Sequence, residues 1–325
     1  MTVTSTLLSI RDLLQDDLTQ LNETIHLSLH SDIDSINSIS EHITQSQGKR
    51  LRPLLTLLCA KACGYQGNDH IVLAAIMELI HTATLLHDDV VDESTQRRGK
   101  ITANAKWGNP ISVLVGDFLY SRSFQLMAQL NHPLIFKVLA DTTNIIAEGE
   151  VLQLTHSCQA DLDESTYLQV IHHKTAQLFE SACQLSAVLA NQPQATQDAL
   201  QAYGRHFGMA YQLIDDVLDY TADSKLGKNR GDDFREGKVT LPLIVALNNL
   251  PDQHCAALQQ HIAHENPMDF EQALALLQTH DCFTYSLTLA QAQTSQASAC
   301  LQQLPASDYR DALAALLYFI THRDY

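Results

Sequence analysis

The chain has 325 residues, of which 45% are hydrophobic and 18% are charged, with only 12 glycines and 8 prolines. This composition is typical of a globular protein with a sizeable core, and it excludes the disordered and collagen-like classes. The 37 acidic residues outnumber the 20 basic ones, which gives a net charge of −17. We therefore expect neither nucleic acid nor an anionic membrane surface as a partner, although a local cluster of cations can still bind a small anion.

No segment of the sequence indicates a membrane protein or an exported one. The longest apolar stretches, 71–77 and 312–320, are much shorter than the ~18–20 residues that a membrane span needs. The first 18 residues carry three aspartates and lack the basic region of a signal peptide. The sequence therefore predicts a cytoplasmic protein without a transmembrane segment.

Apolar residues that recur at intervals of three and four predict helices along most of the chain. In chain order, the predicted helices are 51–62, 71–90, 111–130, 133–155, 165–190, 196–220, 241–250, 270–278, 283–301 and 308–322. We expect no strand, because alternating β-branched runs are scarce, and the polar, glycine-containing stretch 221–239 predicts a mobile loop. Since no linker divides the chain, we predict one all-α domain over residues 1–325, with helices around a common core.

One acidic motif occurs twice. DDVVD at residues 88–92 recurs as DDVLD at residues 215–219, and each copy ends a long apolar helix. Asp88 and Asp92 share one helix face, ~6 Å apart along the axis, where two carboxylates near a helix C-terminus repel each other. Mg²⁺ relieves this repulsion, because it takes one or two carboxylates together with phosphate oxygens. A single copy could equally be a solvated acidic helix end, but the duplication favours a magnesium site.

Basic residues precede and follow the first copy of the motif. They are Lys49, Arg50, Arg52, His81, Arg97 and Arg98. The first three open a helix, where cations oppose the helix dipole unless an anion binds there. Adjacent arginines point apart, as if they served two neighbouring anions. Taken alone, His81 could be an ordinary core residue, and the basic group could be a solvated turn.

Six ordered segments together resemble the all-trans polyprenyl diphosphate synthases. They are GKRLRP (48–53), HTATLLHDDVVDESTQRRG (81–99), VGDFLYSRSF (115–124), KT (174–175), YQLIDDVLDY (211–220) and GKNRGDDFREGKVTLP (227–242). The resemblance is strongest to bacterial members that make the side-chain precursor of ubiquinone. It implies an all-α isoprenoid synthase fold with a deep cavity, usually in a homodimer. It also implies that isopentenyl diphosphate is added to an allylic diphosphate such as farnesyl diphosphate, to a product of about C40.

The resemblance also implies a role for individual residues. Asp88 and Asp92 would bind two Mg²⁺ and Asp215 a third. The allylic diphosphate would be contacted by Arg97, Lys174, Thr175, Gln212, Lys228 and Lys238. Isopentenyl diphosphate would be held by Lys49, Arg52, His81 and Arg98. The catalytic set is then Asp88, Asp92, Arg97, Lys174, Asp215 and Lys228, while Arg50 is left without a role.

Two small residues, Ala83 and Thr84, lie five and four positions before Asp88. Short-chain members of the family typically carry an aromatic ring at this level, so small residues here imply a long product. A more modest interpretation is that Ala83 is a good helix former packed against a neighbour.

Three other functions remain open at this point. A prenyl synthase with a shorter or longer product, such as geranylgeranyl or solanesyl diphosphate, would carry the same motifs. A class I terpene cyclase would need no second diphosphate site, so the additional cations argue against it. A non-catalytic partner subunit of a heteromeric synthase would be expected to have degraded acidic motifs, and both copies are complete here.

Overall fold

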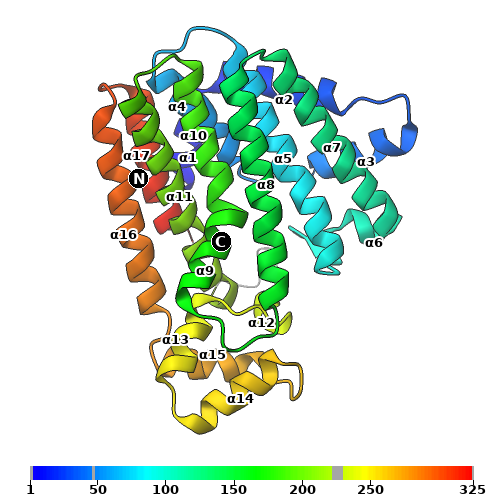
Figure 1. Ribbon diagram of the computed structural model, residues 1–325, viewed down its shortest axis with the longest axis vertical. Coiled ribbons are helices and arrows are strands. Elements are labelled where there is room, and N and C mark those ends of the chain that lie inside the picture. Colours follow the sequence, from blue (N-terminus) through cyan, green and yellow to red (C-terminus); the bar gives the residue numbers. More distant parts are fainter. Residues whose placement is uncertain (1–2, 46–47, 222–229, 324–325) are drawn as a thin grey trace.

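The computed structural model describes residues 3–45, 48–221 and 230–323, which form a bundle of helices (Figure 1). The first half contains α1 (Val3–Leu13), α2 (Gln15–Leu29), α3 (Asp34–Gln45), α4 (Leu51–Ala62), α5 (Asp69–Val91), α6 (Ala103–Trp107), α7 (Asn109–Gln129) and α8 (Pro133–His156). The second half contains α9 (Glu164–Ile171), α10 (Gln177–Leu189), α11 (Gln194–Thr221), α12 (Asp232–Arg235), α13 (Leu241–Asn249), α14 (Asp252–Ile262), α15 (Phe270–Thr279), α16 (Thr284–Cys300) and α17 (Asp308–Thr321). A π-helical turn, η1 (His172–Ala176), joins α9 to α10, and a 3₁₀ turn, η3 (Leu301–Gln303), follows α16.

The structure confirms the ten predicted helices and, within the described residues, adds five that were not predicted, α1, α2, α3, α6 and α14. Three further differences concern the predicted segments themselves. The predicted helix 165–190 is interrupted by the π turn η1. The expectation of no strand is wrong, because β1 (Gln96–Arg97) pairs antiparallel with β2 (Lys100–Ile101); strands of two residues are too short to show an alternating pattern. Within the expected loop 221–239, the described part contains the short helix α12.

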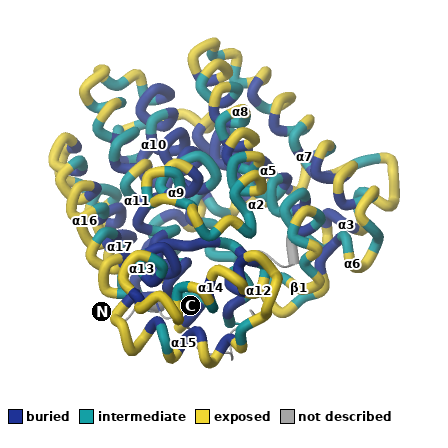
Figure 2. Tube along the Cα trace, turned by 60° about the horizontal axis from the view of Figure 1, so that its bottom comes forward, coloured by how far each residue is buried: buried dark blue, intermediate teal, exposed yellow. Residues whose placement is uncertain are grey.

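The core lies where α4, α5, α10 and α11 meet (Figure 2). Twelve of the thirteen residues of α10 are buried, as expected for a helix surrounded by others on every side. A polar side chain of this buried helix has a hydrogen-bond partner on a neighbouring helix: Ser186 Oγ donates a hydrogen bond of 2.9 Å to the Thr56 carbonyl oxygen of α4. A second apolar cluster lies among α9, α11 and the small helices α13–α15 at one end of the bundle.

Helix α5 is the only described helix that is long and apolar enough to cross a membrane, by length and composition alone. Its apolar window is 67% buried inside the protein, and it includes the buried polar side chains of His70 and Glu78. A core helix of a globular protein has these properties. This helix carries the first acidic motif at its C-terminal end.

Candidate active site

A pocket of about 740 Å³ lies at the centre of the bundle, between α4, α5, α8, η1 and α11. This volume lies in the range of sites for small molecules. Fourteen of the residues singled out in the sequence line it: Lys49, Arg50, Arg52, His81, Thr84, Asp88, Asp92, Arg97, Arg98, Lys174, Thr175, Gln212, Asp215 and Lys238. Lys228 lies outside the described residues. Ala83 is fully buried in the core and is not among the residues that line the pocket.

The first acidic motif forms one wall. Asp88 lies in the last turn of α5, and Asp92 caps that helix. Each carboxylate faces a lysine: Lys174 Nζ lies 3.8 Å from Asp88 Oδ2, and Lys238 Nζ lies 2.9 Å from Asp92 Oδ2. Burial raises the pKa of Asp88, against the positive charge of Lys174 and Arg97. Two carboxylates one helical turn apart are therefore held in a partly desolvated, cation-rich wall.

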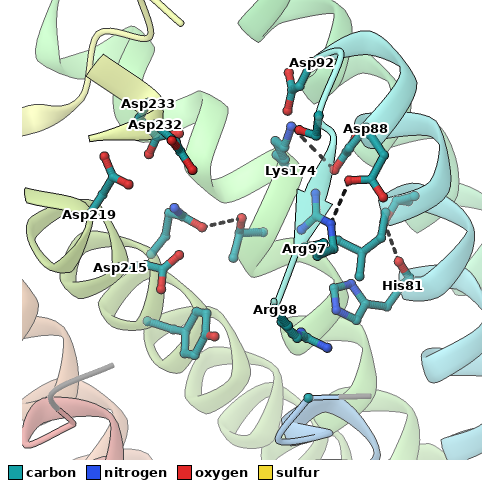
Figure 3. Close-up of a pocket in the computed structure, with 18 of the residues that line it drawn as sticks. His81, Asp88, Asp92, Arg97, Arg98, Lys174, Asp215, Asp219, Asp232 and Asp233 are labelled. Carbon is teal, nitrogen blue, oxygen red and sulfur yellow. Dashed lines mark hydrogen bonds and ion pairs between the residues drawn. The ribbon is translucent and has the colours of Figure 1, made fainter. Parts of the chain in front are cut away.

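The second acidic motif forms the opposite wall (Figure 3). Asp215 points into the pocket and lies 3.3 Å from the guanidinium of Arg323, which follows α17. Its neighbour Asp216 is buried and accepts hydrogen bonds from Tyr167 Oη at 2.5 Å and Gln212 Nε2 at 2.7 Å. Burial, followed by repulsion from Asp233, raises the pKa of Asp216 to about 7. Asp215 thus lines the pocket where it can contact a ligand, while Asp216 anchors the motif through its hydrogen bonds.

Lys174 and Thr175 reach the pocket from the π turn η1. Lys174 Nζ donates hydrogen bonds to Glu150 at 2.5 Å and to Gln153 at 2.8 Å, and Thr175 Oγ1 donates to Gln212 Oε1 at 2.8 Å. Glycines allow the neighbouring helices to pack against this turn. A Cβ at Gly149 of α8 would lie 2.9 Å from the Lys174 backbone nitrogen, and one at Gly208 of α11 would lie 2.5 Å from Ala176 Cα. The close packing fixes the bulge that turns both side chains toward the pocket.

The hairpin β1–β2 supplies the two adjacent arginines. Arg98 and Gly99 occupy its turn with φ of 53° and 72°, the positive values that two-residue hairpin turns of type I′ require. Arg97 Nε donates to Asp89 Oδ1 at 2.8 Å, whereas the guanidinium of Arg98 lies against Gly48, where a Cβ would overlap it. The two side chains therefore diverge, as the sequence predicted (Figure 3).

A second group of cations lies on the side of α4. Arg52 Nη1 donates to His81 Nε2 at 3.3 Å, and its guanidinium stacks on the ring of Phe179 at 4.2 Å. Burial lowers the pKa of Arg52 to about 10, and burial next to arginines lowers the pKa of His81 well below its usual range. The neutral His81 ring can therefore accept the hydrogen bond from Arg52 and orient it. Lys49 lies over the ring of Phe319, 5.4 Å from its centroid.

Several pocket residues were missed by the analysis of the sequence. They are Glu150, Asp89, Arg323 and Glu78, and each forms an ion pair with a residue singled out in the sequence. Their partners are, in the same order, Lys174, Arg97, Asp215 and Arg50, the last at 3.7 Å. Burial, partly offset by Lys174, raises the pKa of Glu150 to about 7. All four are counter-charges of the predicted residues. They lie 8 to 108 positions away along the chain, so no local spacing could have revealed the pairs, although the acid Asp89 lies inside the first motif.

The donor set of the pocket fits Mg²⁺. Asp88, Asp92 and Asp215 offer only oxygen ligands, which this hard cation prefers. Within the described ranges, no group of three His, Cys, Asp or Glu side chains converges closely enough to hold a metal ion by itself. Mg²⁺ commonly binds through one or two carboxylates and completes its shell with water and substrate phosphates. The two facing acidic walls are therefore suited to metal ions that arrive with a phosphorylated ligand.

The comparisons with known proteins agree with this geometry. A sequence model of the polyprenyl synthetase family matches residues 33–277. The octaprenyl diphosphate synthase of Haemophilus influenzae is 44% identical over 318 residues, which cover 97% of each chain. The all-trans-nonaprenyl-diphosphate synthase (geranyl-diphosphate specific) of Rhodobacter capsulatus is 45% identical over 302 residues, covering 92% of this chain and 93% of that protein.

The fold is likewise that of known prenyl synthases. The crystal structure of a polyprenyl synthase from Caulobacter crescentus, complexed with calcium and isoprenyl diphosphate, superposes with a TM-score of 0.95 at 41% identity over 98% of each chain. A decaprenyl diphosphate synthase from Rhodobacter capsulatus superposes with a TM-score of 0.93 at 40% identity, over 98% of this chain and 99% of that one. The chain therefore belongs to the polyprenyl synthetase family and is a trans-prenyltransferase with the all-α isoprenoid synthase fold.

Proposed function

We propose that this enzyme adds isopentenyl diphosphate repeatedly to an allylic diphosphate, most readily farnesyl diphosphate, to give an all-trans product of about C40. One observation carries the proposal. Two acidic motifs face each other across a single pocket that also holds two separate groups of cations. A reaction between two diphosphates needs two such anion sites. A class I cyclase needs one.

The allylic diphosphate binds between the acidic walls in this proposal. Asp88, Asp92 and Asp215 hold its Mg²⁺ ions, three per site as the family resemblance implies. Its oxygens are contacted by Arg97, Lys174, Thr175, Gln212 and Lys238, and by Lys228, which lies outside the described residues. Bound Mg²⁺ supplies positive charge that stabilises the departing diphosphate.

Isopentenyl diphosphate binds on the side of α4, with Lys49, Arg52, His81 and Arg98 as its contacts. The stacking of Arg52 on Phe179 and its hydrogen bond to His81 support this assignment, because they fix the guanidinium before the substrate arrives. Preorganised cations of this kind stabilise charge without paying for reorganisation at the moment of reaction.

The chemistry follows from these two sites. The carbon–oxygen bond of the allylic diphosphate breaks, and the diphosphate leaves with the bonding pair toward Lys174, Arg97 and Lys238. The double bond of isopentenyl diphosphate attacks the allylic cation and forms the new carbon–carbon bond. A proton then leaves the adjacent carbon, with the released diphosphate as its acceptor. The apolar walls of the pocket exclude water that would quench the cation.

The length of the product depends on the space below Asp88. Thr84 lines the pocket, and the small side chain of Ala83 beside it is compatible with a long tail. The similarity to octaprenyl and nonaprenyl synthases supports a long-chain product. Such a product suits the side chain of a quinone.

The assembly and cellular location of the enzyme are further parts of the proposal. We expect one catalytic domain over residues 1–325, since residues from Leu7 to Arg323 line the same pocket. We expect a homodimer in the cytoplasm. Support for the dimer comes from α7 and α8, which carry seven of the fifteen exposed large hydrophobic residues in the described part of the chain.

The test is a product assay with the purified protein, isopentenyl diphosphate, farnesyl diphosphate and Mg²⁺, with the products separated by chain length. Linear products near C40 are expected. Cyclic hydrocarbons would indicate a cyclase, absence of turnover would indicate a partner subunit, and a dominant C20 or C45 product would correct the length.

A further inference from the structure

Glu78 is a buried acid that the proposed reaction does not use. It lies on α5, one turn before His81 and Thr82, and its side chain is 10% exposed at the edge of the pocket. A buried carboxylate is costly unless cations or hydrogen-bond donors compensate its charge. Its place in the most cationic part of the pocket therefore needs an explanation.

Three guanidinium groups from two segments of the chain lie near Glu78. Arg50 Nε lies 3.7 Å from Glu78 Oε1, and the positive charges of Arg50, Arg52 and Arg98 oppose the effect of burial on the Glu78 pKa. Arg50 precedes α4, Arg52 lies in its first turn, and Arg98 lies in the turn of the β1–β2 hairpin. One carboxylate thus serves as the counter-charge for three arginines.

These arginines are confined, and their charges repel one another. Arg50 has a left-handed backbone with φ of 53°, and Arg98 lies directly against Gly48. The Nε atoms of Arg50 and Arg52 are buried and make no hydrogen bond with any other described residue. Like charges brought together in a partly desolvated site move apart unless an opposite charge holds them.

We propose that Glu78 is a positioning residue, whose carboxylate holds Arg50 and aligns Arg52 and Arg98 toward the diphosphate of the non-allylic substrate. The inference rests on the proposed function, since Arg52 and Arg98 are the residues assigned there to isopentenyl diphosphate. It also gives Arg50 a role. Arg50 holds Glu78 in place. Arg50 is itself held by Asn22, to which its guanidinium donates a hydrogen bond.

The variant Glu78→Gln distinguishes positioning from simple charge balance, because the two predict opposite results. If Glu78 only weakened the positive potential, its loss would strengthen diphosphate binding and lower the KM for isopentenyl diphosphate. If it positions the arginines, we expect this KM to rise at least ~10-fold, with less than a ~2-fold change in the KM for farnesyl diphosphate. The dissociation constant for isopentenyl diphosphate alone, measured by calorimetry, should rise in parallel.

The matched control is Asp17→Asn. Asp17 is also a buried acid with two partners, the cation Lys61 at 3.2 Å and the imidazole of His70 at 3.1 Å, and its side chain is 12% exposed. It packs against the same helix α5 but does not line the pocket, so we expect both KM values to stay within ~2-fold of wild type. In addition, Arg50→Gln combined with Glu78→Gln should weaken binding no further than Glu78→Gln alone, because both act through one ion pair.

A KM for isopentenyl diphosphate that falls or stays unchanged in Glu78→Gln would overturn the proposal. An equal rise of both KM values would do the same, since the carboxylate would then support the pocket in general. The calorimetric measurement separates this proposal from the proposed function. An inactive wild type would refute prenyl transfer, whereas the position of Glu78 would still be judged from the loss of binding.

Discussion

At the scale of single residues, each acid expected to bind metal has a cationic partner in the described structure. Lys174 lies near Asp88, Lys238 near Asp92 and Arg323 near Asp215. Such pairs hold the carboxylates in place, and metal ions can replace the cations as their partners when a diphosphate binds. The acids are thus positioned for metal ions that bind with a diphosphate, and the cations can then contact the negative charge of that diphosphate.

Replacing Asp88 or Asp215 should abolish most of the activity. We expect Asp88→Ala and Asp215→Ala each to lower kcat by at least ~10²-fold, on the scale of a lost contact to the charge that develops in the transition state. The helical circular dichroism should barely change. The control is Asp198→Ala, which removes an exposed carboxylate from the same helix as Asp215. Activity within a few-fold of wild type in either variant, at saturating Mg²⁺, would refute the metal assignment.

The buried acid Asp216 should make stability depend on pH. Its pKa is raised to about 7 when folded and is about 3.9 when unfolded. As the pH rises between these values, the unfolded chain releases the proton and the folded protein keeps it, so stability falls. Asp216→Asn removes this titration and retains a group that can accept the hydrogen bond of Tyr167.

We therefore expect the Tm of Asp216→Asn, relative to that of wild type, to increase between pH 5 and pH 8. Thermal melts in the presence of EDTA exclude any contribution of bound metal. Other acids whose pKa is raised, such as Glu150, are present in both proteins, so their effects cancel in the Tm difference between variant and wild type. A difference that does not change with pH would show that Asp216 is charged in the folded protein.

At the scale of elements, the β1–β2 hairpin separates the two arginines. Its turn points Arg97 toward Asp89 of α5 and Arg98 toward Gly48 before α4. We expect Arg97→Ala to raise mainly the KM for farnesyl diphosphate, and Arg98→Ala mainly that for isopentenyl diphosphate. Lysine should not fully replace either residue, because it lacks the bidentate guanidinium. Equal effects of both variants on both KM values would contradict this division.

The position of Ala83 on α5 gives a prediction about chain length. Ala83 is fully buried in the same apolar cluster as Val115 and Leu119 of α7, whereas Thr84 lines the pocket. We expect Ala83→Tyr to shorten the products to about C15–C20, because a close-packed wall cannot take up the ring without giving up space in the cavity. The same substitution should also lower the Tm. Full-length products at a normal rate would show that the tail does not pass Ala83.

The sequence predicted those elements that carry several turns of apolar periodicity. It did not predict α2, whose buried Leu21, Ile25 and Leu29 form one thin stripe among polar residues. It also missed the π turn η1, since this bulge depends on Gly149 and Gly208 of two other helices. At the site, the motif residues were found because they are close in sequence. Their counter-charges, such as Glu78 and Arg323, become visible only when distant segments meet.

At the scale of the whole molecule, both ends of the chain contribute to the pocket. Leu7 and Arg11 of α1 and Arg323 beyond α17 line it together with the central helices. The guanidinium of Arg323 lies over the ring of Tyr211 at 4.0 Å and donates to the Tyr211 carbonyl oxygen at 2.9 Å. The terminal helices therefore complete a site whose motifs all lie between residues 48 and 242.

The outer face of α7 and α8 should carry the contact between two copies of the enzyme. Large hydrophobic side chains are exposed there, among them Leu114 at 63%, Val151 at 65% and Leu154 at 61%. An exposed apolar area of this kind on neighbouring helices is typical of a protein interface.

A buried aspartate without a partner destabilises such an interface strongly. We expect Leu114→Asp to convert the dimer into a monomer in light scattering after size-exclusion chromatography, while Leu287→Asp, on the exposed side of α16, leaves the mass unchanged. If wild type is a monomer, or if Leu114→Asp remains a dimer, the second copy does not bind at this face.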